Sequence, residues 1–184
     1  MELSTTGVHH ITLIGSNRED TIAFYEGVLG MPFVFEQPNL DVPQEVHLYF
    51  DPGDGRLITF FVRTNRPTDP TPVPEVVGNV HHIAYEVSRE THDRAANRLR
   101  ELGHPNTGPV DRGFMDSLYF RDPNGFLIEL AVYKFAPPPG HTRVDVLALA
   151  HRLRLEQGAY AITEEHCRQA VDRLSAAPVE SRVG

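Results

Sequence analysis

Several features that would assign a protein to a class at once are missing or scarce in this sequence. Its 184 residues include a single cysteine, Cys167, so an internal disulfide framework is excluded. No apolar run is long enough to cross a bilayer, and no signal-peptide pattern is present. A basic surplus is also lacking: the net charge is −8, whereas a general binder of nucleic acid or of anionic membranes would need a basic face. We therefore predict a cytoplasmic globular protein with a small-molecule partner.

One segment, residues 117–132, combines two strand-like runs with a tight turn. Residues 117–121 and 126–132 are rich in aromatic and branched side chains, and the sequence Asp-Pro-Asn-Gly at 122–125 favours a turn, so we predict a β-hairpin. Glu129 lies in the middle of its second, hydrophobic strand. An ionised carboxylate there is costly unless it is paired, hydrogen-bonded or bound to a metal. The sequence therefore predicts a compensating group close to Glu129.

The first third of the chain has the pattern of a βαβββ unit. A strand that carries the pair His9-His10 precedes a helix, whose start is predicted by a capping box of Ser16 and Glu19 and whose end is predicted by Gly30. Three more strands follow, separated by turn residues. The four predicted strands span residues 7–14, 32–36, 45–51 and 56–63.

The same pattern then starts again. After a proline-containing segment, a strand over 80–87 carries the pair His81-His82, a helix over 90–102 precedes Gly103, and the hairpin completes the unit. The motifs Leu-Tyr-Phe and Gly-x-Leu-Ile recur in the same order in both halves. We therefore predict two modules of one design. The predicted parts are the modules 1–64 and 80–136, the linker 65–79 and a tail over 137–184.

The predicted tail is helical. It follows three prolines and a glycine at 137–140, and its apolar residues recur at helical spacing in two stretches, the second of them capped by Thr163. Two placements of this helical hairpin stay open: packing on the outside of a sheet, or covering a site or subunit contact. The predicted fold is thus α+β, with two tandem βαβββ modules that form a curled mixed sheet around a metal site, plus a C-terminal helical hairpin.

Alternation along the strands indicates which histidines could meet Glu129. It places His10 and His82 on the more polar faces of their strands, on the side of Glu129 and Tyr119. Two imidazoles and one carboxylate form the facial arrangement that lets Fe(II) bind a chelating substrate and dioxygen together. The counterpart of Glu129 in the first module is Thr59, a poor ligand, which leaves the predicted site open. For each histidine taken alone, packing or surface exposure is the ordinary alternative.

At these motifs the sequence resembles the vicinal oxygen chelate superfamily, over Gly7 to roughly Tyr133. The stretches GVHHIT, VHHIAYEV and LYFRDPNGFLIEL are similar to the ligand segments of its extradiol-type ring-cleaving dioxygenases. The resemblance implies His10, His82 and Glu129 as iron ligands. It also implies that Tyr119 exchanges a proton with the substrate, and that Arg112, as in the hydroquinone-cleaving branch, holds a substrate anion or orients Tyr119. For these two residues an amphipathic core position and a surface charge are the alternatives.

The predicted activity is therefore Fe(II)-dependent ring cleavage of a dihydroxylated aromatic, a hydroquinone or a catechol, with O2 as second substrate and with Mn, Zn or Ni as alternative metals. His47 is a further candidate acid-base group, or a packed histidine, and His9 and His81 are candidate donors that hold the ligand imidazoles. The dioxygenases that it resembles mostly carry four modules, so two modules imply a homodimer. A glyoxalase-like lyase or isomerase and a metal-free, antibiotic-binding type of protein are the alternatives.

Overall fold

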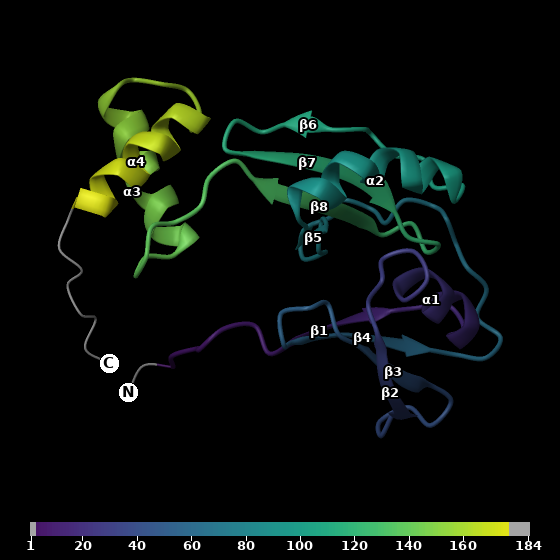
Figure 1. Ribbon diagram of the computed structural model, residues 1–184. Helices are drawn as coiled ribbons and strands as arrows, with labels where there is room; N and C mark the ends of the chain where they lie inside the picture. The colour runs from purple at the N-terminus through teal and green to yellow at the C-terminus, as the bar shows by residue number, and fades with distance from the viewer. Residues whose placement is uncertain (1–2, 177–184) are drawn as a thin grey trace. The chain divides into compact units, whose positions relative to one another are not determined.

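The computed structural model describes residues 3–176, which form two four-stranded sheets and four helices (Figure 1). The described chain divides into two compact units. The first comprises residues up to 85 together with 97–106 and 119–129, and the second comprises the remainder. The predicted α+β class is confirmed, with a mixed sheet for each half of the duplication and a helical hairpin after them. The ends of the predicted first module and tail, residues 1–2 and 177–184, lie outside the described residues.

The first sheet has the strand order β1-β4-β3-β2. Strand β1 runs parallel to β4, and the other neighbours are antiparallel. One face buries apolar side chains from β3 and β4 around Phe24 and Tyr25 of the helix α1, and the rings of Tyr25 and Phe60 lie 4.3 Å apart. The elements are β1 (His10–Ile14), α1 (Arg18–Tyr25), β2 (Phe33–Pro38), β3 (Val46–Phe50) and β4 (Leu57–Val62).

The start of α1 differs from the prediction by one residue. Asn17, not Ser16, caps the helix, because its side-chain oxygen accepts a 2.9 Å hydrogen bond from the backbone N–H of Asp20. Ser16 is buried instead, and its hydroxyl has no partner among the described residues. Serine and asparagine are equally good caps, so sequence pattern alone did not separate these neighbours.

The second sheet has the order β5-β8-β7-β6 and repeats the order of the first. The predicted hairpin is confirmed as β7 and β8, but β6 was missed because it has only two residues and no periodicity to detect. Strand β5 also begins later than predicted, after the pair His81-His82. The elements are β5 (Ile83–Glu86), α2 (Arg89–Glu101), β6 (Val110–Asp111), β7 (Met115–Arg121) and β8 (Leu127–Tyr133).

The turn between β7 and β8 is tied to the first module. The Asp122 carboxylate accepts 2.9 Å hydrogen bonds from the backbone N–H groups of Asn124 and Phe126, and the buried Tyr25 hydroxyl donates to its other oxygen at 2.9 Å. Burial raises the pKa of Asp122. The linker also reaches this turn, because the Val73 N–H donates to the Gly125 carbonyl at 3.2 Å. Besides reversing the chain, the turn therefore binds helix α1 through Tyr25 and the linker through Val73.

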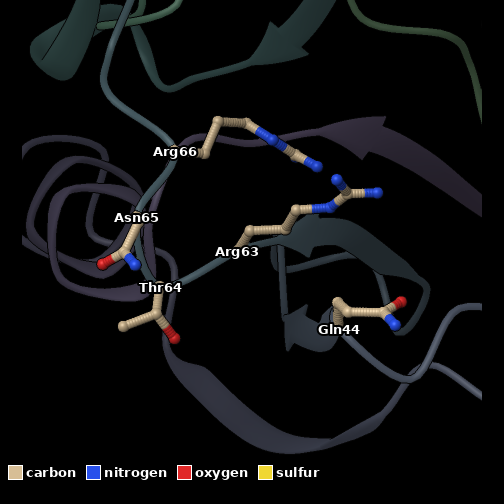
Figure 2. Close-up of a pocket in the computed structure, with 5 residues that line it drawn as sticks. All are labelled: Gln44, Arg63, Thr64, Asn65 and Arg66. Atoms are coloured by element: carbon tan, nitrogen blue, oxygen red, sulfur yellow. The ribbon is translucent and has the colours of Figure 1, made fainter.

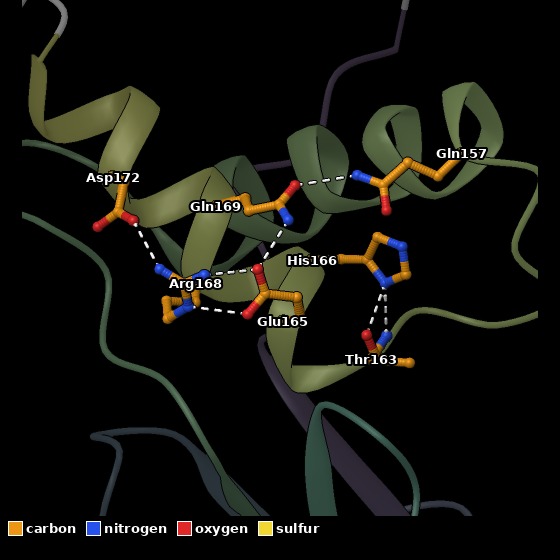
Figure 3. A network of polar contacts seen from close by, with 7 residues as sticks. All are labelled: Gln157, Thr163, Glu165, His166, Arg168, Gln169 and Asp172. Carbon is orange, nitrogen blue, oxygen red and sulfur yellow. Dashed lines mark hydrogen bonds and ion pairs between the residues drawn. The ribbon is translucent and has the colours of Figure 1, made fainter.

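The tail forms two helices, α3 (Arg143–Glu156) and α4 (Glu164–Ala176), with their own buried cluster. Thr142 and Asp145 form a capping box at the start of α3. A polar contact joins the second helix to the end of the first: Gln157 donates to Gln169 at 2.9 Å, and within α4 Gln169 donates to Glu165 at 2.7 Å (Figure 3). The buried residues are Val146, Ala150, Leu153, Cys167 and Ala170. Among the described residues, no helix has the length and apolarity needed to span a membrane.

Lys134, which follows β8, bridges Asp111 and Asp116 with N···O distances of 2.7 and 3.2 Å, and Arg89 also contacts Asp116 at 2.6 Å. The hydrogen bond from Lys134 lowers the pKa of Asp111. Burial acts to raise the pKa of Asp116, but hydrogen bonds from Arg89 and Lys134 outweigh it, so that this pKa is also lowered. The stabilisation that these ion pairs give the folded protein is therefore present above the unfolded carboxyl pKa of about 4. It is lost as the pH falls through the pKa values of the two carboxyls in the folded state.

We expect Lys134→Met to reduce the free energy of unfolding at pH 6, and to reduce it by less at pH 3, because the bridge is progressively lost as the two carboxyls become protonated. Urea unfolding of both proteins at the two pH values measures the difference. The control is Arg94→Gln on α2, whose exposed ion pair with Glu90 should contribute little at either pH. A loss of stability for Lys134→Met that is equal at pH 6 and pH 3 would show that the bridge does not act through these carboxyls.

Candidate metal centre

Glu129 and His82 are brought into contact. Glu129 is 2% exposed on β8, and its Oε2 lies 2.9 Å from Nε2 of His82, the residue just before β5. The sequence prediction of a compensating group beside this carboxylate is met by that imidazole. Nitrogen and carboxylate oxygen are also the donor types that a divalent transition metal takes from proteins.

Both histidine pairs have the same local geometry. Nδ1 of His81 lies 2.7 Å from Nδ1 of His82, and the corresponding distance between His9 and His10 is 2.8 Å. The two rings of each pair are nearly perpendicular, at 81° and 80°. Strict strand alternation would turn His81 away from His82, but both precede β5, so that rule does not apply to them. Each pair makes this contact through Nδ1, so Nε2 of its second histidine takes no part in it.

Tyr119 lies beside this contact on β7. Its ring centroid is 6.0 Å from that of His82, with the rings at 88° to one another. Arg112 is exposed in the turn between β6 and β7, where its N–H donates to the Met115 carbonyl at 2.9 Å. The structure thus brings Tyr119 to the pair of His82 and Glu129, and the role of Arg112 stays a prediction from the resemblance.

In the first sheet, a chain of hydrogen bonds occupies the face that carries His10. The Gln37 amide donates to Tyr49 at 3.0 Å, Tyr49 lies 2.7 Å from Nδ1 of His47, and Nε2 of His47 lies 2.8 Å from the Thr59 hydroxyl. Thr59 in turn donates to Thr12 at 2.8 Å. Burial, and after it the charge of His10, lower the pKa of His47. The lowered pKa favours the neutral form of His47 at pH 7.

The sequence predicted only His47 as a candidate group here and not this chain, because Gln37 and Thr12 carry no sequence signal that links them to a histidine. It explains why Thr59 can replace the carboxylate of the second module: its hydroxyl is satisfied by His47 and Thr12. Within residues 3–176, no three His, Cys, Asp or Glu side chains are grouped closely enough to hold a metal. The placement of His10 as a third ligand therefore stays a prediction.

Comparison with known proteins agrees with this fold. A model of the glyoxalase/bleomycin resistance protein/dioxygenase superfamily matches residues 7–130. The chain belongs to this superfamily. One solved relative, a glyoxylase/bleomycin resistance protein/dioxygenase domain from Frankia sp. EAN1pec, has a TM-score of 0.61 at 18% identity, over 71% of this chain and 100% of that domain. At that identity it supports the superfamily fold alone.

Two curated members of the superfamily are closer in sequence. A Bacillus subtilis (strain 168) protein named "Putative ring-cleaving dioxygenase MhqO" is 31% identical over 135 residues, which are 71% of this chain and 41% of MhqO. Biphenyl-2,3-diol 1,2-dioxygenase 3 of Rhodococcus globerulus is 29% identical over 145 residues, 75% of this chain and 69% of that enzyme. The chain thus spans less than half the length of MhqO.

Proposed function

We propose that this protein is a non-haem Fe(II)-dependent dioxygenase that cleaves the ring of a dihydroxylated aromatic, a hydroquinone or a catechol. The contact between His82 and the buried Glu129 carries the proposal, because it places two candidate ligand side chains together, one of them a carboxylate in an apolar strand. His10 is the proposed third ligand. The names of the two curated relatives support dioxygenase chemistry, and Fe(II) is chosen over Mn, Zn or Ni because the predicted ligands match the facial triad.

The proposed ligands fit such a metal in donor type. Bound Fe(II) would supply Lewis acidity toward the substrate hydroxyls and redox chemistry with O2. His82 would give up the proton between its Nε2 and Glu129, and His81 would hold its Nδ1 in place. Tyr119 would hydrogen-bond the substrate and exchange a proton with it. Arg112 would hold a substrate anion or orient Tyr119, and His47 would serve as a further acid-base group.

The proposal is tested by measuring O2 uptake on protein reconstituted anaerobically with Fe(II), against a panel of catechols and hydroquinones, with metal content measured on the same sample. We expect tightly bound iron, and O2 uptake with at least one diol accompanied by a new chromophore. Bound metal without uptake on any diol would favour a glyoxalase-like lyase or isomerase instead. Protein that retains no metal would favour a metal-free binding protein.

We expect Tyr119→Phe to lower kcat about 100-fold while the iron content stays unchanged, because only a proton-transfer group is removed. Steady-state O2 uptake and metal analysis of the same preparation check this. The control is Tyr133→Phe, at the end of β8, whose ring packs under Arg143 at 5.1 Å and has no proposed role in the reaction. An unchanged kcat for Tyr119→Phe would remove the proton-transfer role.

The homodimer and the cytoplasmic location predicted from the sequence belong to the same proposal. The homodimer follows from the resemblance, since two modules are half of the four that most similar dioxygenases carry. Light scattering on the purified protein measures the mass in solution and tests it directly.

A further inference from the structure

A second polar cluster lies where the first sheet meets the linker, and it contains none of the proposed metal ligands. It surrounds a cavity of about 500 Å³ (Figure 2). This volume lies within the range of small-molecule sites. The lining residues come from the loop before β3 and from the segment after β4: Gln44, Arg63, Thr64, Asn65 and Arg66.

Two guanidinium groups of this cluster share one carboxylate. Oε1 of Glu45, a side chain only 9% exposed, accepts from Arg63 Nε at 3.1 Å and from Arg66 Nη2 at 2.7 Å. The hydrogen bond from Arg66, with others from Asn39 and Arg63, lowers the pKa of Glu45. Glu45 is therefore ionised at neutral pH and cancels one of the two positive charges. The cluster keeps a positive surplus.

The two arginines are used differently. Arg66 also donates from Nη1 to the carbonyls of Gly15 and Phe61, at 2.6 and 2.9 Å. It therefore hydrogen-bonds the backbone at the ends of β1 and β4. Arg63 donates only through Nε, and within residues 3–176 its Nη1 and Nη2 meet no acceptor. The Arg63 side chain is 50% exposed, against 25% for Arg66. Nη1 and Nη2 of Arg63 are thus available to bind a ligand.

Other hydrogen-bond donors accompany the Arg63 guanidinium. Figure 2 shows the Arg63 and Arg66 side chains extending in the same direction, with the Gln44 amide on the same side of the view. Within the described part of the chain, the Gln44 side chain makes no hydrogen bond to protein. A guanidinium end with two parallel N–H groups matches the two oxygens of a carboxylate or phosphate.

We propose that this cavity binds an oxyanion, the carboxylate or phosphate group of a small molecule, through Nη1 and Nη2 of Arg63 with Gln44 as an additional donor. Glu45 fixes the guanidinium from its other edge, which reduces the entropy lost when the anion binds. The site shares no residue with the proposed metal centre, so it is a second binding site beyond the proposed function.

Calorimetric titration of the full chain with two probes, inorganic phosphate and benzoate, tests the site. We expect saturable binding of at least one probe, weakened about tenfold or more in Arg63→Gln, since a charge-assisted hydrogen bond pair is lost. The matched control is Arg56→Gln, because Arg56 is similarly exposed at 48% and pairs with a single carboxylate, Asp54. Its affinity should equal that of the parent protein. Binding of phosphate only would assign a phosphorylated ligand, and of benzoate only a carboxylated one.

Two further variants keep the test decisive. Gln44→Ala leaves the arginine network intact and should weaken binding in the same direction, so the site is tested even if Arg63→Gln loses stability. Glu129→Gln should bind the probes like the parent protein, which separates this site from the metal centre. No saturable binding of either probe, or equal affinity in the parent, Arg63→Gln and Gln44→Ala proteins, would overturn the proposal.

Discussion

Replacing Glu129 with glutamine should weaken Fe(II) binding by about 100-fold and abolish O2 uptake with every diol. The amide keeps the shape of the side chain and can still hydrogen-bond His82, so the change removes the negative charge and one ligand oxygen with little change in packing. Because the side chain is 2% exposed, water has little access to replace the lost ligand. Metal content after dialysis and O2 uptake on the same sample measure both effects.

The control for this variant is Glu86→Gln. Glu86 lies on the neighbouring strand β5, but it is exposed and pairs with Arg143, so its replacement should leave metal content and uptake unchanged. Thermal unfolding of the metal-free proteins shows whether Glu129→Gln is folded. If the folded variant retained iron with parental affinity, Glu129 would not be a ligand. Loss of iron would in turn rule out a metal-free binding protein.

Gly125→Ala should destabilise the protein by about 3 kcal/mol, the largest effect that we expect from a single methyl group. Two costs combine. The φ angle of Gly125 is +73°, a conformation that costs an alanine about 1 kcal/mol. In addition, its Cβ would lie 1.8 Å from the carbonyl oxygen of Thr71, so the linker or the turn must move. Urea unfolding gives the total.

Gly55→Ala separates the two costs. Gly55 occupies the corresponding turn of the first module with φ +77°, but a Cβ there would meet no atom within 4 Å. We expect a loss of about 1 kcal/mol, the conformational cost alone. Limited proteolysis within residues 65–79 adds a local measurement, since release of the linker from the turn would expose it in Gly125→Ala. Equal stabilities for the two variants, with an uncleaved linker, would contradict the contact with Thr71.

Local patterns predicted most of the elements. The hairpin around Asp122 to Gly125, the helix that ends before Gly103 and the helical tail all follow from periodicity and turn residues. The exact ends of the elements, and the short strand β6, could not be predicted from these patterns. Asn17 replaced Ser16 as a cap because both residue types accept the same hydrogen bond, and β6 is too short to show a period.

The site was predicted only in part. Glu129 stands out in sequence because a charge in an apolar strand needs a partner, and the repeated histidine pairs suggested one. Which imidazole meets it depends on pairing between β5 and β8, and each histidine pair lies where its strand begins, so that strand alternation does not fix its geometry. The hydrogen-bond chain from Gln37 to Thr12 includes residues of all four strands of the first sheet, so no local pattern contains it.

The sequence by itself determined the duplication and the α+β class and singled out the candidate side chains of the site, because hydrophobic period, caps and turn residues act over a few neighbouring residues. Only the tertiary structure decided that Tyr25 binds Asp122, that Thr71 packs on Gly125 and that two arginines share Glu45. These contacts join residues distant in the chain. They depend on strand register and on the packing of buried side chains, which no single segment of sequence encodes.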